Sequence, residues 1–349
     1  MLCISDAQVD AIVPANQVPD TYGVVRRETG FIAPGLVDLQ VNGGGGCLFN
    51  ADPSVAGIRT ICQTHAQFGV TALLPTLITD EAEKTGAAIE AGIVAARENV
   101  PGFAGLHLEG PHISQAKKGA HPQRYIRSMT DADLEQLLKA RRKLPALLVT
   151  VAPENATLDQ VKALAAGGIR VSLGHTAGTY AVAQEYVAAG ATMITHLFNA
   201  MSQMTARDPG VAGAALSDGR LSAGLIADGH HVTPEMIGTA LRAKKLPGRI
   251  FLVSDAMPTV GSGETAFSIS GREVRLQHGR LAYDDGTLAG AHLNLRQAVG
   301  FMAGSAGIDL AEVLRMAGLY PAEAMGWTDR GHLRPGARAE FCCFAEDLT

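Results

Sequence analysis

Eight apolar, strand-like runs that alternate with helix-like stretches leave few folds open to this chain. The runs are rich in Val, Ile and Leu and lie at about 31–41, 71–77, 103–109, 145–152, 169–175, 192–198, 221–228 and 250–256. The stretches between them are rich in Ala, Leu and Glu or Gln, such as 54–68, 80–98, 130–142, 157–166, 179–189 and 234–245. This alternation predicts an α/β fold built as a (β/α)8 TIM barrel, and a doubly wound open sheet is the competing architecture.

The two ends of the chain do not follow the alternating pattern. Short β-prone pieces occur at 11–13 and 22–26, and the tail returns to strand-like sequence near 339–344. We therefore expect a small β-sandwich domain formed by both chain termini. The expected division is a first part of the small β domain at 1–33, a barrel at 34–328 with a β-hairpin insertion at about 262–286, and the remaining part of the small domain at 329–349.

Composition indicates a large covered core and argues against several classes of protein. Hydrophobic residues make up 47% of the chain and charged residues 18%, as expected for a sheet that is buried on both faces. The net charge of -5 and a pI near 6.1 give no reason to expect a nucleic acid or a membrane as partner. The five cysteines lack metal-binding or disulfide-like spacing. We expect a cytoplasmic protein without a membrane span.

Unusual polar residues occur where the strand-like runs end. Glu109 ends the third run, His175 the fifth, His196 the sixth and Asp255 the eighth. In a barrel, the carboxyl ends of the strands form the face on which active sites are built. A single histidine or carboxylate in such a place is more often a satisfied structural group. Four of them on one rim favour a functional site.

These four residues suggest metal-assisted hydrolysis. Glu109, His175 and His196 supply one carboxylate and two imidazoles, a ligand set for a divalent transition metal with an open position for water. Such an ion lowers the pKa of its water from 15.7 to roughly 7 and polarises a carbonyl oxygen. Asp255 stands alone in an apolar run, where it could move a proton from water to a leaving group. The alternative for Asp255 is a structural cap of the following segment.

Seven short motifs follow one another in a specific order along the chain. They are HLEGP at 107–111, KKGAH at 117–121, LGHT at 173–176, THLFNAM at 195–201, ADGHH at 227–231, LVSDA at 252–256 and GTLAG at 286–290. In these motifs the chain resembles the N-acetylglucosamine-6-phosphate deacetylases, a family of the amidohydrolase superfamily. The resemblance extends over almost the whole chain, from PGLVDLQVNG at 34–43 to LRPGARAEF at 333–341.

This resemblance implies an activity and a set of site residues. The reaction is hydrolysis of N-acetyl-D-glucosamine 6-phosphate to D-glucosamine 6-phosphate and acetate, in amino-sugar catabolism or recycling. Glu109, His175 and His196 would bind the metal, and Asp255 would act as general base and then acid. His121 would stabilise the oxyanion, a donor role worth about 2.7–4 kcal/mol. The residues expected to bind substrate are Ala120, His121, Asn199, Ala200, Arg207, His231, Leu288, Ala289, Gly290 and Ala291.

The expected phosphate contacts also imply a homodimer. By the resemblance Arg207 and His231 face the phosphate, and the arginine can come from the neighbouring subunit. Arg207 could instead be an ordinary loop charge paired with Asp208. His230 and His231 are adjacent, so only the register of the family motif favours the second of them.

The first strand departs from the pattern of the wider superfamily. That superfamily often has a His-x-His pair there for a second metal, whereas this chain has Gln40 and Asn42. Neutral amides are weak ligands for zinc or iron, so we expect one divalent ion per subunit, with zinc favoured over iron or another ion. Alternatives are a deacetylase of the galactosamine 6-phosphate epimer, another amidohydrolase such as a dihydroorotase or aminoacylase, and an inactive sugar-phosphate binding homologue.

Overall fold

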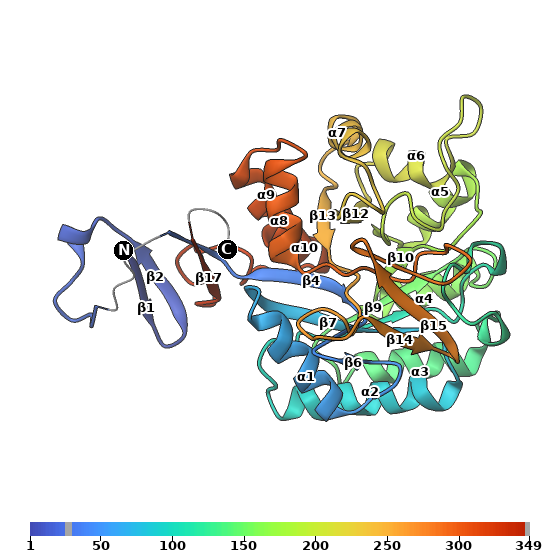
Figure 1. The fold of residues 1–349 in the computed structure, drawn as a ribbon, viewed down its shortest axis with the longest axis horizontal. Helices are drawn as coiled ribbons and strands as arrows, with labels where there is room; N and C mark the ends of the chain where they lie inside the picture. Colours follow the sequence, from blue (N-terminus) through green and yellow to red (C-terminus); the bar gives the residue numbers. More distant parts are fainter. Residues whose placement is uncertain (25–29, 346–349) are drawn as a thin grey trace.

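Eight parallel strands form a closed barrel in the computed structural model, which describes residues 1–24 and 30–345 (Figure 1). In order around the barrel they are β4 (Leu36–Val41), β7 (Val70–Ile78), β8 (Leu106–Glu109), β9 (Leu147–Val151), β10 (Arg170–Leu173), β11 (Met193–Ile194), β12 (Ser222–Ile226) and β13 (Ile250–Val253). The barrel closes between β13 and β4, where the N–H of Asp255 donates to the carbonyl of Gln40 at 2.9 Å. The prediction of a (β/α)8 barrel is confirmed, and an open doubly wound sheet is excluded.

Helices surround the barrel and cover the outer face of its strands (Figure 1). They are α1 (Val55–Ala66), α2 (Ala82–Arg97), α3 (Asp131–Arg141), α4 (Leu158–Ala166), α5 (Tyr180–Ala189), α6 (Gly210–Ser217), α7 (Pro234–Ala243), α8 (Leu295–Gly304), α9 (Leu310–Ala317) and α10 (Leu319–Met325). The sequence did not predict α6, and Gly318 separates α9 from α10. Within the described residues, no helix combines the length and apolar character that a membrane crossing needs.

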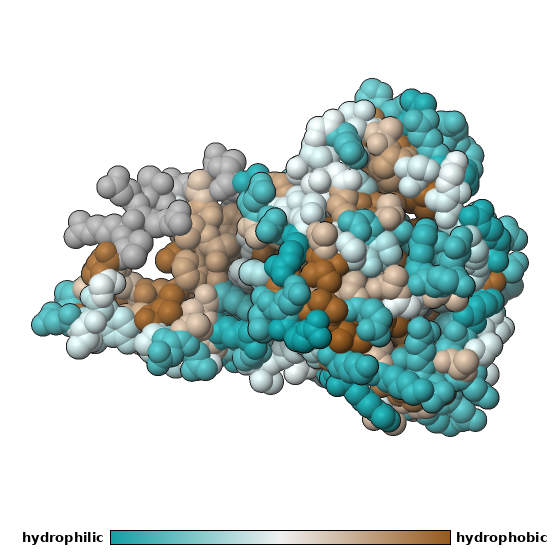
Figure 2. Space-filling view, turned by 90° about the horizontal axis from the view of Figure 1, so that it is seen from below, coloured by the Kyte–Doolittle hydropathy of each residue, from teal (hydrophilic) through white to brown (hydrophobic). Residues whose placement is uncertain are grey.

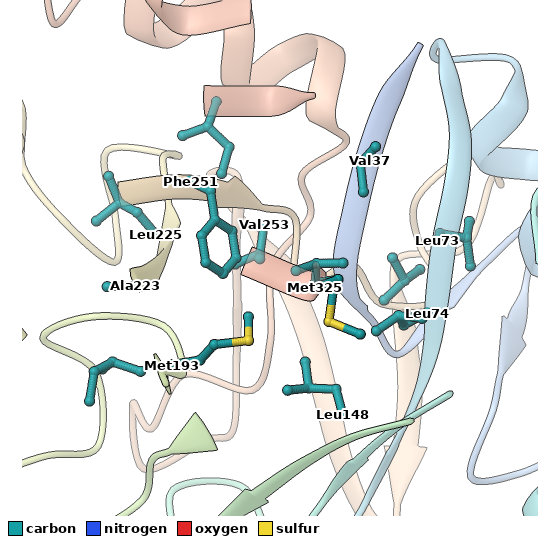
Figure 3. Close-up of a cluster of buried hydrophobic side chains, with 14 of the residues drawn as sticks. Val37, Leu73, Leu74, Leu148, Met193, Ala223, Leu225, Phe251, Val253 and Met325 are labelled. Atoms are coloured by element: carbon teal, nitrogen blue, oxygen red, sulfur yellow. The ribbon is translucent and has the colours of Figure 1, made fainter. Parts of the chain in front are cut away.

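The interior of the barrel is filled by apolar side chains. In Figure 3, side chains such as those of Leu74, Leu148 and Phe251 point toward the middle of the barrel near Met325 of α10, whereas Leu73 points to the outer side of its strand. The strand residues labelled there are Val37, Leu73, Leu74, Leu148, Met193, Ala223, Leu225, Phe251 and Val253. Because this packed core leaves no channel through the barrel, a binding site has to form at the ends of the strands.

The chain termini form two small antiparallel sheets beside the barrel. In one sheet β3 (Phe31–Pro34) pairs with β17 (Phe341–Phe344), and in the other β1 (Leu2–Ser5) pairs with β2 (Gln8–Ile12). A hydrogen bond of 2.8 Å from the N–H of Val9 in β2 to the carbonyl of Ala337 links the second sheet to the segment that leads into β17. We propose that they form one small β domain, with the boundaries expected above. The β-prone piece at 22–26 lies partly outside the described residues.

Apolar surface is concentrated on this terminal part of the molecule. Ile12, Ile32 and Phe341 are exposed there, whereas the barrel side of the visible face is mostly hydrophilic (Figure 2). The strands of the terminal sheets are short, and part of their apolar surface stays exposed.

A small sheet lies in the range where the sequence predicted a hairpin insertion, and it has one strand more than a hairpin. It consists of β14 (Ala266–Ile269), β15 (Arg272–Gln277) and β16 (Arg280–Ala282) in one antiparallel sheet. Its apolar side forms a second small core with Ile78 and Met257 at the barrel rim. The hydroxyl of Tyr283 donates to the carbonyl of Ala120 at 3.2 Å. The insertion therefore supports the loop that follows β8. Short paired strands, β5 (Gly43–Gly44) and β6 (Cys47–Leu48), follow β4.

Candidate active site at the carboxyl ends of the barrel strands

Three potential metal ligands converge at the ends of β8, β10 and β11. The Nε2 atoms of His175 and His196 lie 3.0 Å apart, and they approach Oε1 of Glu109 to 3.2 and 3.0 Å respectively. All three side chains are buried. Among the described residues, these three form the cluster of His, Cys, Asp and Glu side chains that could hold a metal ion. The structure thus brings together the three residues that the sequence indicated as ligands.

Backbone carbonyls determine which nitrogen of each histidine carries its proton. The Nδ1–H of His175 donates to the carbonyl of Lys117 at 2.7 Å, and that of His196 donates to the carbonyl of Asn199 at 3.1 Å. A carbonyl can only accept a hydrogen bond, so the proton of each neutral ring lies on Nδ1. Each Nε2 then points its lone pair at the cluster, as a metal-binding imidazole does.

The donor atoms fit a divalent cation. Two imidazole lone pairs and a carboxylate oxygen face one another, which is repulsive unless positive charge lies among them. Bonds of 2.0–2.2 Å in a tetrahedral site give ligand–ligand edges of about 3.3–3.6 Å, slightly longer than the separations of 3.0–3.2 Å in the cluster. Burial raises the pKa of Glu109, but positive charge at His175 and His196 outweighs it and holds that pKa well below its usual value, and a cation bound among the three donors would act in the same direction. The carboxylate is therefore ionised.

Three site residues share an uncommon backbone conformation. The φ angles are 47° at His175, 28° at His196 and 50° at Asp255, in the left-handed region that L-residues rarely adopt. Each such residue costs about 1–3 kcal/mol and persists where the surrounding structure holds it. The backbone leaves the strand direction at these points, and the three side chains turn toward a common centre.

Two side-chain amides hold Asp255 in place. The Nδ2 of Asn42 donates to Oδ1 of Asp255 at 2.6 Å, and Nε2 of Gln40 donates to the same oxygen at 3.1 Å. Gln40 also reaches both carboxylate oxygens of Glu109 at 3.3 Å. Burial, followed by the negative charge of Glu109, raises the pKa of Asp255 to about 6. Gln40 and Asn42 therefore act in this structure as hydrogen-bond donors to the two carboxylates.

His121 lies beside the cluster, in the loop after β8. Its Nε2 is 3.8 Å from Oε2 of Glu109, and its ring centre is 4.4 Å from that of His175. Burial, followed by the charge of His175, holds the pKa of His121 well below its usual value. The ring is therefore neutral and can offer one N–H to a bound molecule.

A pocket of about 300 Å³ opens onto these groups, within the size range of small-molecule sites. Of the residues expected to bind substrate, Ala120, His121, Asn199, Ala200, His231, Leu288 and Gly290 line it. Ala289 and Ala291 are buried in the two cores behind the wall, and Arg207 is exposed on the loop before α6. Within one chain the pocket is thus built without Arg207.

The structure distinguishes the two adjacent histidines after β12. His231 lines the pocket, and its Nδ1–H donates to Oδ2 of Asp228 at 2.7 Å. His230 is exposed and lies close to Gly279 of the hairpin insertion. A Cβ atom built on Gly279 would be 3.1 Å from the Nε2 of His230. Because Nδ1 of His231 is bonded to Asp228, its Nε2 points away from that carboxylate. This second nitrogen is therefore available to contact a ligand in the pocket.

Several lining residues were not singled out as substrate contacts in the sequence. Most are apolar or small, and the full set is Asn42, Ile78, Ala116, Lys117, Gly119, Ile226 and Met257. An apolar residue at a strand end looks like any core residue in the sequence. For Ile78, Ile226 and Met257, the position at or just after the ends of β7, β12 and β13 was the signal in the sequence that could have identified them.

Comparisons with known proteins agree with this geometry. The model of the amidohydrolase family matches residues 31–348. An N-acetylgalactosamine-6-phosphate deacetylase from Shewanella sp. (strain ANA-3) is 39% identical, and the alignment covers 92% of this chain and 81% of that protein. The human N-acetylglucosamine-6-phosphate deacetylase is 36% identical, with 93% and 82% covered.

A solved structure shows the same fold. The crystal structure of N-acetylglucosamine-6-phosphate deacetylase from Pasteurella multocida superposes with a TM-score of 0.95 and 33% identity. The alignment covers 100% of this chain and 91% of that one. With a family match over most of its length and relatives of this similarity, the chain belongs to the amidohydrolase family.

Proposed function

We propose that the chain hydrolyses N-acetyl-D-glucosamine 6-phosphate to D-glucosamine 6-phosphate and acetate. The observation that carries this proposal is the convergence of Glu109, His175 and His196 opposite Asp255 in one pocket. Water adds across the amide, so its oxygen goes to acetate and its protons go to the amine and to solvent. The activities of the relatives of this chain supply the substrate class.

The residues of the chain have separate tasks in this reaction. A divalent ion held by Glu109, His175 and His196 would activate water and polarise the amide carbonyl. Asp255, oriented through Oδ1 by two amides, takes a proton from the attacking water and passes it to the leaving nitrogen. His121 donates its N–H to the carbonyl oxygen as negative charge develops there.

Substrate recognition is assigned to the other side of the pocket. Asn199, Ala200, Leu288 and Gly290 line the wall that would face the sugar, and His231 would donate to the phosphate. Arg207 is exposed outside the pocket. Its guanidinium is therefore free to reach the pocket of a second copy of the chain. We therefore propose a homodimer, in which Arg207 binds the partner's phosphate as a bidentate donor.

The first strand supports a single ion. Gln40 and Asn42 donate to Asp255, and neutral side-chain amides are weak ligands for zinc or iron. The proposal is one divalent ion per subunit, with zinc favoured and iron as the alternative. Two equivalents per subunit, both required for turnover, would refute it. We also propose a cytoplasmic location, consistent with the five free cysteines.

One experiment tests the reaction and its sugar preference together. Acetate release is measured from N-acetylglucosamine 6-phosphate and from N-acetylgalactosamine 6-phosphate, with metal-quantified protein, before and after chelation. We expect release from the first substrate and its loss with chelator. The relative at 39% identity is an N-acetylgalactosamine-6-phosphate deacetylase, so preference for the second substrate is the alternative function. Release from neither substrate, with metal restored, would overturn the proposal.

A further inference from the structure

Thr79 makes two contacts with the same nitrogen of His121. Its backbone N–H donates to Nδ1 at 3.3 Å, and its side-chain oxygen lies 2.8 Å from that nitrogen. Thr79 follows the last residue of β7 and is buried, with 1% of its surface exposed. It is not among the residues that line the pocket. Any effect of Thr79 on a bound substrate must therefore pass through another residue.

The backbone contact determines the tautomer of His121. A backbone N–H can only donate, so Nδ1 of His121 must supply a lone pair and cannot carry a proton. The ring proton then lies on Nε2. With the nitrogen acting as acceptor, the Thr79 hydroxyl also donates to it.

The opposite tautomer would be unfavourable at both ends of the ring. A proton on Nδ1 would leave the buried N–H of Thr79 without this acceptor, and an unsatisfied buried donor is destabilising. It would also turn the lone pair of Nε2 toward Oε2 of Glu109, which is 3.8 Å away. Two electron-rich atoms would then face one another in a buried site.

Gly110 makes this approach possible. The residue has a φ of +89°, and a Cβ atom built on it would lie 2.1 Å from the Thr79 hydroxyl oxygen. Only glycine leaves room for the hydroxyl between the strand end and the histidine. The same hydroxyl lies 3.5 Å from the carbonyl of Glu109, so it sits between a metal-ligand strand and His121.

We propose that Thr79 is a positioning residue that holds His121 as its Nε2–H tautomer, so that this ring acts as a donor to the developing oxyanion and not as a base. The inference rests on the proposed function for its catalytic meaning. The tautomer itself depends only on the geometry of Thr79 and His121 in the folded protein.

The first test reads the tautomer directly. Zinc-loaded protein is labelled with 15N-histidine, and the His121 signals are identified by their loss in His121→Gln. We expect an unprotonated Nδ1 and a protonated Nε2 in the wild type. A proton on Nδ1 would overturn the proposal. This measurement needs no substrate, so it stands even if no acetate is released and the proposed function fails.

The second test is a double-mutant cycle on turnover. Thr79→Val removes the hydroxyl but keeps the shape and the backbone N–H. We expect kcat to fall about 2- to 10-fold with KM unchanged, the size of one hydrogen bond, and Thr79→Ser to restore it. In a His121→Ala background Thr79→Val should have no further effect. An equal loss in both backgrounds, or no rescue by serine, would refute the role.

A matched control separates this role from a general effect on β7. Thr71 lies on the same strand, and its hydroxyl approaches the carbonyl of Leu36 at 3.5 Å, among residues that do not line the pocket. Thr71→Val makes the same chemical change there. We expect wild-type kcat and wild-type His121 signals in this variant. A loss of kcat equal to that of Thr79→Val would show that the effect of Thr79 is structural only.

Discussion

The two sides of the pocket are built in different ways. On the reacting side, Glu109, His175, His196 and Asp255 are buried at strand ends and each is held by hydrogen bonds. On the side assigned to the phosphate, His231 is held by one aspartate and Arg207 is exposed on a loop. On the proposed assignment, the difference teaches that one chain completes the reaction centre by itself, whereas binding of the anion depends on loops and on a second copy.

The largest effect is expected at Asp255. Asp255→Asn keeps the shape and the hydrogen bonds from the two amides but cannot take a proton. We expect kcat to fall about 10²- to 10⁴-fold with one equivalent of metal still bound. Acetate release and metal analysis of the same sample check this. Retained turnover would remove Asp255 from the role of base.

His121→Ala should have the next largest effect, again on the reacting side. It removes one donor to the developing oxyanion, and such a loss reduces kcat about 10²- to 10³-fold. Because the donor acts mainly in the transition state, KM should change little. Steady-state kinetics, which gives kcat and KM separately, checks this prediction. A change confined to KM would place His121 in ground-state binding.

Arg207→Ala should act on the phosphate side, through KM. Loss of a charged hydrogen-bonding group corresponds to about a 10- to 100-fold fall in kcat/KM. Mixing this variant with Asp255→Asn gives a heterodimer in which one pocket has both an intact Asp255 and the partner's Arg207. We expect the mixture to regain low-KM activity. Failure to regain it, with exchange of subunits demonstrated, would place the arginine in its own pocket or in none.

The smallest effect is expected at His230, which serves as the control for His231. His231 lines the pocket and His230 does not, so His231→Ala should raise KM about tenfold, whereas His230→Ala should change it less than twofold. The KM of each variant is measured with the phosphorylated sugar and with the same sugar without phosphate. Equal sensitivity of the two variants would contradict the assignment of the phosphate to His231.

The alternation of strand-like and helical segments was sufficient to predict the barrel and the rim on which the site lies. Shorter features were not predictable from the pattern. The sixth run was expected at 192–198, but β11 ends at Ile194 because His196 has already left the sheet with a positive φ. The helix α6 was missed because Gly210 and Gly213 weaken its propensity, while its burial against the barrel stabilises it.

The candidate site was predictable to the extent that its residues have distinctive chemistry. Ionisable side chains such as Glu109 are unusual at the end of a buried strand and therefore stand out. Thr79, Ile78 and Met257 do not stand out in the sequence, because threonine and apolar residues are common in strands. Their importance comes from the side chains that they contact in the folded protein. That depends on tertiary contacts such as the bond from Thr79 to His121.

The closure of the barrel has a consequence for folding. Asp255 and Asn42 are 213 residues apart in the chain, and they meet across the seam where β13 joins β4. Contacts this distant in sequence form late, after the costly closure of a long loop. An intermediate in which the seam is open would lack the amide contacts of Asp255. During refolding, activity should therefore recover at the same rate as the first and last strands pair. The time course of activity would then report the closure of the barrel.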